Sequence, residues 1–374
     1  MLKESISIKN FGPLVDVNIS EIKKLNVFIG DSGSGKSTIM KVLVLFQWLF
    51  KQIGIRSYLK KSGIKDNPQE FNFKEYLANN GISDYLRKDT EIIYTRGKYV
   101  ISYKSGRLNT RIDLDDEDLS LEKMSYISDK RNLIPDLYAD KVPEDRISDF
   151  FLKETLNDFK IVVKDLQEVL VPAVKVSVIK RNGSFGKDEL YVKDGEETNP
   201  YEIHMEDSSS GMQNVIPMYL IIQYFATKYN MTESAKNTIR KYMFDTDMIE
   251  KFGALTPAFN LADIQNNNIH LHIEEPELSL YPDGQIQLLQ DLIDICYKKN
   301  NKKYNISMVI STHSPYIMNY LNLVIKNRNL NFDEIAAYQV KDGEVLTLMR
   351  SNNQVVDTRA LSDPIGRIYK KYNS

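Results

Sequence analysis

A glycine-rich turn between two apolar stretches carries the residue pattern best suited to hold phosphate groups. Residues 27–29 are apolar, and the sequence that follows fits G-x-x-x-x-G-K-[ST] before a second apolar stretch begins. The glycines allow a tight turn whose backbone N–H groups face a phosphate, and the start of the next helix adds positive partial charge. The residues expected to contact phosphate groups are Gly30, Asp31, Ser32, Gly33, Ser34, Gly35, Lys36, Ser37 and Thr38.

Two of these side chains have more specific expected roles. Lys36 is expected to reach the β- and γ-phosphates of a nucleotide and to take part in catalysis, and the Ser37 hydroxyl is expected to ligate Mg²⁺. A glycine-rich turn without a ligand is the alternative. The Lys-Ser pair that follows the last glycine in register disfavours it.

A pair of carboxylates after a later apolar strand supplies the other half of such a site. Residues 269–273 are expected to form this strand, and Glu274 and Glu275 follow it. Mg²⁺ needs a negatively charged oxygen ligand and an attacking water needs a base. We therefore assign Glu274 to the metal and Glu275 to orienting or deprotonating the water. An acidic strand end before a turn is the alternative interpretation.

Strand geometry also places two histidines on the same face as one of these carboxylates. Because side chains alternate along a strand, His270, His272 and Glu274 share a face, which is an arrangement that a metal could use. Packing or hydrogen bonding of the two histidines with neighbouring strands is the favoured interpretation.

Two more polar segments lie next to expected helices. Residues 208–213 precede an apolar helix, and this polar start supplies capping oxygens and backbone donors. His313 follows an expected strand at residues 306–310 and precedes a helix that begins at Tyr316. An ordinary helix cap and a structural histidine are the alternatives for these segments.

Together these motifs resemble the ABC-type ATPase heads, particularly the branch that contains the OLD-like and RecF/SMC-like ATPases. The resemblance covers nearly the whole chain, from an N-terminal I-K-N-F-G through the phosphate loop to residues 208–213 as the signature motif, I-E-E-P-E-L-S-L-Y-P as Walker B and D-loop, and S-T-H-S as the switch. In such heads two copies hold ATP and Mg²⁺ between them. The resemblance therefore implies that Ser209 and Gly211 of one copy face the γ-phosphate held by the other. It also implies that His313 contacts that phosphate or its attacking water.

A further segment resembles the OLD-like branch. Residues 126–132 correspond to a Tyr-Ile-Pro-Ala-Glu-Arg sequence found where a Q-loop would fall, with Ser128 and Asp129 in place of proline and alanine. The resemblance makes Arg131 a candidate nucleotide contact, with a surface salt bridge as the alternative.

Composition agrees with a globular protein of the cytoplasm. The chain has 374 residues, 42% of them apolar, and a formal net charge of -2. That is ample for one large or two ordinary domains, and near-neutral charge leaves nucleic-acid binding as an alternative that a local basic patch would support. The single cysteine, Cys296, excludes an internal disulfide. The N-terminus lacks a secretion signal, and the longest apolar run, residues 42–50, is too short to span a bilayer, so we expect no membrane contact.

The elements that position these residues indicate an α/β protein. The expected fold is an ABC-ATPase head with a mixed or parallel sheet core, an antiparallel β subdomain and a helical subdomain. Its expected lobes are residues 1–131, an insertion at 132–206, and residues 207–374. The expected strands cover residues 5–9, 15–19, 91–95, 98–104, 107–114, 173–180, 189–194, 335–340 and 345–349, and the expected helices cover residues 39–50, 147–170, 215–225 and 283–299, with helical pieces in 52–89 and 228–265.

The favoured function is an ATPase whose ATP-dependent head dimerisation controls a separate effector. The residues after His313 carry no acidic cluster of the Toprim nuclease kind, and four histidines leave no room for an HNH-type nuclease. The resemblance therefore suggests the ATPase subunit of a two-component anti-phage defence system with a nuclease or toxin as partner. Residues 147–170 and 228–265 are candidates for effector or oligomer contacts, with a purely structural role as the alternative.

Three other functions remain as alternatives. A RecF-like DNA-repair ATPase is one, and a nucleotide-gated scaffold with little turnover is another. The chain between Arg131 and Ser209 is too short for the long coiled coil of SMC proteins. A transporter ATPase is disfavoured by the expected β-meander and by Glu274, which replaces the usual aspartate.

Overall fold

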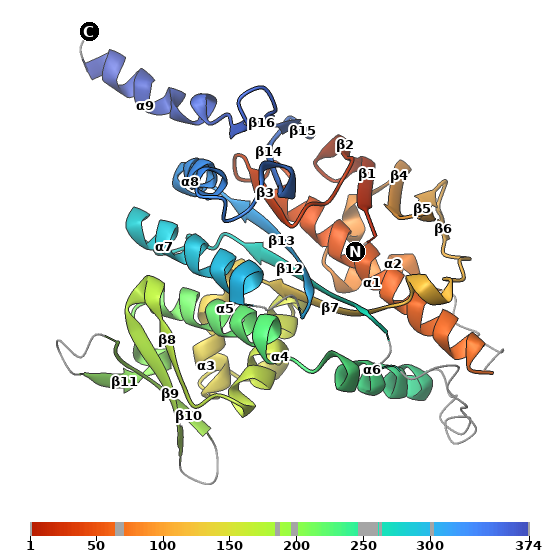
Figure 1. Ribbon diagram of the computed structural model, residues 1–374, viewed down its shortest axis with the longest axis horizontal. Helices are drawn as coiled ribbons and strands as arrows, with labels where there is room; N and C mark the ends of the chain where they lie inside the picture. Colours follow the sequence, from red (N-terminus) through yellow and green to blue (C-terminus); the bar gives the residue numbers. More distant parts are fainter. Residues whose placement is uncertain are drawn as a thin grey trace.

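The structure of the protein, a computed structural model, describes residues 2–63, 71–183, 188–195, 201–245, 261, 264–299 and 303–372 (Figure 1). Its centre is a large mixed sheet to which eleven strands contribute within these residues. In order across the sheet they are β6 (Arg107–Asn109), β5 (Tyr99–Lys104), β4 (Leu86–Arg96), β1 (Glu4–Phe11), β2 (Leu14–Ile19), β15 (Glu344–Thr347), β14 (Ile335–Lys341), β3 (Leu25–Ile29), β13 (Asn305–Thr312), β12 (Asn266–Glu274) and β7 (Ser120–Ile127).

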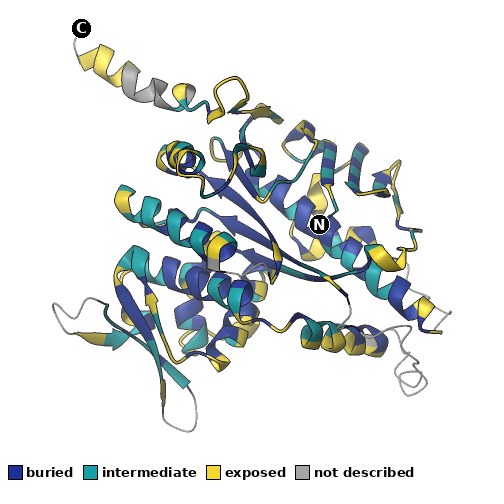
Figure 2. Cartoon of the chain, viewed as in Figure 1, coloured by how far each residue is buried: buried dark blue, intermediate teal, exposed yellow. Residues whose placement is uncertain are grey.

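The sheet has a parallel half and an antiparallel half. The strands β14, β3, β13, β12 and β7 pair in parallel, whereas β6, β5, β4, β1 and β2 form an antiparallel meander, and β15 joins the two halves. The parallel strands are buried on both faces, as their apolar sequences require (Figure 2). The expected fold class, with a mixed sheet core, an antiparallel β subdomain and a helical part, is confirmed.

One helix, α1 (Lys36–Lys61), covers one face of this sheet. Its apolar residues point in nearly every direction because it packs between the parallel strands and the antiparallel meander. It continues eleven residues past the predicted end at Phe50, because Ile53, Tyr58 and Leu59 extend its buried side. Among the described helices α1 alone is long and apolar enough to cross a membrane, but 67% of its most apolar window is buried inside the protein, as expected of a core helix.

Four helices cover the opposite face of the parallel strands (Figure 1). They are α4 (Phe150–Lys164), α5 (Ser210–Thr227), α7 (Pro282–Ile293) and α8 (Pro315–Lys326). Alternate residues of β3 divide between the two sides: Leu25, Val27 and Ile29 face these helices, and Phe28 faces the α1 side. The sheet therefore separates α1 from α5.

A second, four-stranded antiparallel sheet extends from the helical side (Figure 1). It has the order β11 (Glu202–His204), β10 (Asp188–Asp194), β9 (Val176–Asn182) and β8 (Glu168–Val171). The remaining described helices are α2 (Phe73–Asn79), α3 (Ile134–Tyr138), α6 (Met231–Asp245) and α9 (Arg359–Tyr372), and a short hairpin of β16 (Met349–Arg350) and β17 (Val355–Val356) precedes α9. The predicted helix in residues 228–265 is confirmed by α6, and residues 246–260 lie outside the described residues. The lobe boundaries 1–131, 132–206 and 207–374 stay predictions.

Two other predicted elements extend well past the observed ones. The helix predicted to reach residue 170 ends at Lys164, because β8 pairs with β9 and shows strand alternation, with Leu170 exposed and Val171 buried. The strand predicted over residues 107–114 ends at Asn109, because the chain then turns toward α1, where Arg56 donates to the backbone oxygen of Ile112 at 3.2 Å.

The two histidines of β12 share a face, as predicted, and each is used in packing. His270 contacts the Ser307 hydroxyl at 2.9 Å and the Glu122 carboxylate at 2.8 Å, and that carboxylate accepts a hydrogen bond from Arg96 at 2.8 Å. His272 lies parallel to the ring of Tyr126. These contacts with neighbouring strands support the favoured structural interpretation of both histidines.

His272 provides a pH-dependent test of this core. Burial lowers its pKa from 6.5 to about 3, so below about pH 6.5 the unfolded chain binds a proton that the folded chain does not, and stability falls with pH until about pH 3. For His272→Phe, which keeps a ring beside Tyr126, we expect the loss of unfolding free energy between about pH 7 and about pH 5 to be smaller by about 2 kcal/mol. Urea unfolding at both pH values measures this. An equal loss in His272→Phe and wild type would contradict the prediction.

Candidate nucleotide-binding site

The register of the parallel strands brings four loops to one edge of the sheet. Ile29 pairs with Thr312, Ser311 with Glu274, and Ile273 with Ile127, so β3, β7, β12 and β13 end side by side. In open α/β sheets, ligands bind at the carboxyl ends of the strands. The loops that follow these strands carry the predicted residues Lys36, Arg131, Glu275 and His313.

The turn from β3 into α1 needs glycine at its last position. Gly35 has a φ of 106°, and a Cβ there would lie 2.5 Å from a methyl carbon of Leu14. Gly35 is also the N-cap of α1, and no side chain caps this helix start. The first backbone N–H groups of α1 are therefore available to an anion.

The Lys36 side chain folds back over this turn. The residue is largely buried, and its ammonium donates to the backbone oxygens of Gly30 at 2.8 Å and Asp31 at 3.0 Å. Burial lowers the pKa of Lys36, and the nearby carboxylates of Glu275, Asp31 and Glu277 oppose this shift. Two carbonyl oxygens thus hold the Lys36 ammonium beside the loop, and phosphate oxygens could replace them as its hydrogen-bond acceptors.

Buried polar atoms without a partner gather at this edge. Within the described residues no hydrogen bond reaches the hydroxyl oxygens of Ser34 and Ser311 or the second carboxylate oxygen of Glu277. Such atoms are rare in folded proteins unless water or a ligand satisfies them. The edge therefore suits a polar ligand such as a triphosphate.

Glu274 and Ser37 form an oxygen pair suited to a magnesium ion. The Glu274 carboxylate is buried, accepts a hydrogen bond from the backbone N–H of Asp129 at 3.4 Å, and lies within hydrogen-bonding reach of the Ser37 side chain. Burial raises the pKa of Glu274, and the Ser37 hydrogen bond opposes this. Mg²⁺ is bound in proteins by a few such oxygens together with water and phosphate, so these residues fit the ion.

Glu275 and His313 face each other at the open side of the site. The Nε2 atom of His313 lies 3.2 Å from a carboxylate oxygen of Glu275, and both side chains are about one third exposed. Glu275 has a φ of 43°, a left-handed conformation that is uncommon for residues other than glycine and is often found at functional sites. Its backbone N–H donates to the oxygen of Ser311 at 2.9 Å.

Glu277 positions the histidine loop, a role that the sequence analysis missed. One of its carboxylate oxygens accepts hydrogen bonds from the hydroxyl of Thr312 at 2.8 Å and from the backbone N–H of His313 at 2.6 Å. The available signal was the third carboxylate of the E-E-P-E sequence. Its partners come from a different strand, so spacing alone did not reveal them.

Arg131 lies behind the site rather than on its surface. Its side chain is completely buried and donates to the backbone oxygens of Asn214 at 2.9 Å, Glu274 at 2.7 Å and Glu275 at 2.7 Å. Burial lowers its pKa to about 10, which leaves it cationic at neutral pH. The expected nucleotide contact of Arg131 finds no support in this arrangement, and a surface salt bridge is ruled out by its burial.

The predicted signature residues lie at the start of α5. Ser209 is exposed, and its hydroxyl accepts a hydrogen bond from the backbone N–H of Met212 at 3.4 Å as the N-cap of the helix. Gly211 lies close to the turn after β12, because a Cβ there would be 2.9 Å from the backbone oxygen of Ser279. The sheet separates α5 from α1, so the structure does not bring Ser209 and Lys36 of one chain together.

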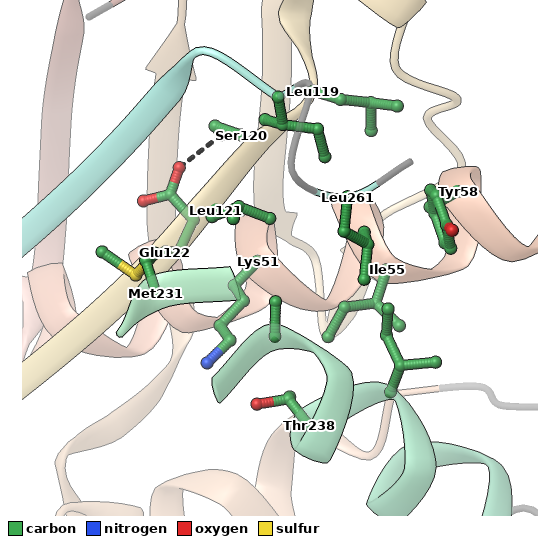
Figure 3. Close-up of a pocket in the computed structure, with 14 residues that line it drawn as sticks. Lys51, Ile55, Tyr58, Leu119, Ser120, Leu121, Glu122, Met231, Thr238 and Leu261 are labelled. Carbon is green, nitrogen blue, oxygen red and sulfur yellow. Dashed lines mark hydrogen bonds between the residues drawn. The ribbon is translucent and has the colours of Figure 1, made fainter. Parts of the chain in front are cut away.

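A separate cavity lies at the other end of α1 (Figure 3). It is enclosed by α1, the start of β7 and α6, and Lys51 points into it. Burial lowers the pKa of Lys51 to about 8. Lys51 is about 22 Å along the helix from Lys36 at 1.5 Å per residue, so this cavity is not part of the candidate nucleotide site.

Solved structures with a similar course of the chain include SMC heads and an ABC cassette. The SMC head domain from Thermotoga maritima is 10% identical, with 93% of this chain and 98% of that chain covered and a TM-score of 0.34. The Smc head domain derived from Pyrococcus furiosus is 12% identical, with 100% of both chains covered and a TM-score of 0.37. MJ0796, a bacterial ABC transporter cassette, is 14% identical, with 91% and 96% covered and a TM-score of 0.29. These scores are too low to carry an argument.

Sequence comparison is more informative. No curated protein is similar enough to match the chain. Residues 49–318 match the family described as AAA ATPase domain. This range is more than half of the chain, begins after the phosphate loop, and includes Arg131, Ser209, Glu275 and His313. The chain belongs to the AAA ATPase domain family.

Proposed function

We propose that this protein binds and hydrolyses ATP between two copies of itself, in the manner of ABC-type heads. The observation that carries the proposal is the gathering of Lys36, Glu274, Glu275 and His313 at one sheet edge, where buried polar atoms lack partners. The family supports ATPase activity in general. The site residues allow each step of ATP binding and hydrolysis to be assigned to a particular side chain.

In this proposal the Lys36 ammonium moves from the carbonyl oxygens of the loop to the β- and γ-phosphates. Ser37 and Glu274 hold Mg²⁺, which supplies positive charge to the phosphate oxygens when bound. Glu275 orients a water and accepts its proton as the water oxygen attacks the γ-phosphorus and the bond to the leaving ADP oxygen breaks. His313, beside Glu275, donates a hydrogen bond to the transferred phosphate or to the water.

The signature segment supports a site built from two copies. Ser209 and the N-terminus of α5 are exposed and offer a hydroxyl and backbone donors to an anion. They lie across the sheet from the Lys36 of their own chain. A second copy would bring its own phosphate loop against them.

We further propose that the ATP-bound dimer controls a separate effector, in bacterial anti-phage defence. The support is the resemblance to OLD-like ATPases together with an exposed surface for a partner. Helix α9 projects from the body of the protein (Figures 1 and 2). Its residues Ile368, Tyr369 and Tyr372 are 68%, 65% and 86% exposed, and their spacing places them along one side of the helix.

Loss of the Lys36 ammonium tests nucleotide binding. We expect Lys36→Ala to weaken ATP binding by about two orders of magnitude, because charge-assisted hydrogen bonds to the phosphates are lost. Titration calorimetry with ATP and Mg²⁺ measures this. The control is Lys60→Ala, at an exposed position near the end of the same helix, which should bind ATP as the wild type does. Equal affinity in Lys36→Ala and wild type would refute the phosphate role of this loop.

Loss of the Glu275 base tests hydrolysis. We expect Glu275→Gln to keep ATP affinity and to lower kcat by about 10²- to 10⁴-fold, because an amide cannot accept the proton. Light scattering should then show a dimer that persists with ATP, and the proteins retained on this dimer from cells identify the effector class. Normal turnover would remove Glu275 from catalysis. A trapped dimer that retains no protein partner, or retains only DNA, would count against effector control and favour the RecF-like alternative.

Mixing two inactive variants tests whether the site is shared. Lys36→Ala subunits keep the signature segment, and Ser209→Arg subunits keep the phosphate loop, so a mixed dimer has one intact composite site. At equal concentrations we expect about a quarter of wild-type ATPase activity, because half of the dimers are mixed and each has one of two sites. Phosphate release across a series of mixing ratios measures this. If no ratio restores activity, the site lies within one chain.

A further inference from the structure

The hydrogen bonds of Arg131 join the two segments that the proposed function assigns to different ATP molecules. Its Nη1 and Nη2 groups donate to the backbone oxygens of Glu274 and Glu275, both at 2.7 Å, and its Nε donates to the backbone oxygen of Asn214 in α5 at 2.9 Å. We propose that Arg131 is a positioning residue that locks the catalytic turn to the signature helix and thereby couples the two composite sites of the dimer. This inference rests on the proposed function.

The first support is the way in which the buried Arg131 side chain is held by main-chain oxygens. Arg131 is a buried cation without an ion-pair partner among the described residues, and its hydrogen bonds end on main-chain oxygens, including that of Ser128 at 3.2 Å. Removing a charge from water is costly unless fixed dipoles replace its hydration. A planar guanidinium donates hydrogen bonds to several carbonyl oxygens in different directions, whereas a lysine ammonium lacks this fixed, forked geometry. The side chain is therefore suited to holding three backbone segments in one relative position.

The second support is strain in the turn that Arg131 holds. Glu275 and Ser279 have φ angles of 43° and 60°, so two residues of this short turn adopt the left-handed conformation. This conformation is unfavourable for residues other than glycine and persists where the surroundings fix it. Arg131 fixes the first end of the turn. A hydrogen bond from the backbone N–H of Leu278 to the oxygen of Glu275, at 3.1 Å, closes it.

The third support is a second contact between the same turn and α5. Gly211 approaches Ser279 so closely that a Cβ would lie 2.9 Å from its backbone oxygen. The Asn214 amide donates to the oxygen of Ser210 at 2.9 Å and to the hydroxyl of Ser279 at 3.4 Å. The turn is thus attached to α5 at both of its ends, through Arg131 at Glu275 and through Gly211 and Asn214 at Ser279.

These contacts link Glu275 to the start of α5 in the same chain. Glu275 acts on the nucleotide held by its own chain, whereas Ser209, at the start of α5, faces the nucleotide held by the partner. A movement of the turn that aligns Glu275 must therefore move the first turn of α5. Nucleotide binding at one composite site then changes the geometry of the other composite site. Two sites linked in this way are cooperative.

The test compares Arg131→Lys with the neighbouring control Lys130→Ala. Lys130 is exposed and pairs with Asp149 at the surface, so its loss should change nothing. For Arg131→Lys we expect the Hill coefficient for ATP hydrolysis to fall from near 2 to about 1 and kcat to fall about tenfold. ATP affinity of the single subunit, measured in a Ser209→Arg background, should stay within about threefold of the control. A general loss of structure would instead lower that affinity as well.

The outcomes separate this inference from the proposed function. A wild type that neither dimerises with ATP nor hydrolyses it refutes the proposed function. A wild type that does both, with an unchanged Hill coefficient and kcat in Arg131→Lys, overturns the coupling role alone. If Arg131→Lys does not fold, Arg131→Gln decides, because a single amide nitrogen cannot donate to the main-chain oxygens of Glu274, Glu275 and Asn214 together and so cannot join the turn to α5. Reduced cooperativity in that variant supports the inference, and wild-type cooperativity overturns it.

Discussion

The parallel pairing of β3, β13 and β12 is the interaction on which the rest of the structure depends. It places Ile29, Ser311 and Glu274 side by side at the carboxyl edge, although they lie far apart in the sequence. Each of these strands is buried on both faces, so a shift in register would expose apolar residues to water or bury polar ones. The hydrophobic core therefore fixes the relative positions of the phosphate loop, the carboxylates and the histidine before any ligand binds.

The same sheet explains why the proposed site needs a second copy of the chain. Its two faces are covered by different helices, with α1 on one and α5 on the other. The starts of these two helices consequently belong to opposite faces, so in the proposal a ligand held by one is not in reach of the other within a chain. Arg131 and the strained turn after β12 lie between them and provide the connection within the chain.

The sequence was sufficient to predict the fold class and to place the candidate residues that depend on local backbone geometry. The glycines and Lys36 of the phosphate loop, the carboxylates after β12 and the polar start of α5 all follow from short patterns, and so does the α/β class. It was insufficient where side chains bond to main-chain atoms of distant segments. Arg131 looked like a surface or ligand residue because carbonyl acceptors have no sequence signature, and Glu277 received no role because its partners lie on another strand. The strand β8 was missed because its valines also fit the spacing of the preceding helix.

Electrostatics distinguishes the candidate site from the rest of the interior. Where β1, β4 and β7 meet, buried charges form ion pairs, since Arg96 lies between Glu4 and Glu122. At the carboxyl edge Lys36, Arg131, Glu274 and Glu277 are also buried, yet none forms an ion pair with another charged side chain in the described part of the chain. Main-chain groups and the hydroxyls of Ser37 and Thr312 hold them instead. Buried charges left in this state weaken a fold, and a ligand that brings both phosphate oxygens and a divalent cation would neutralise both signs at once.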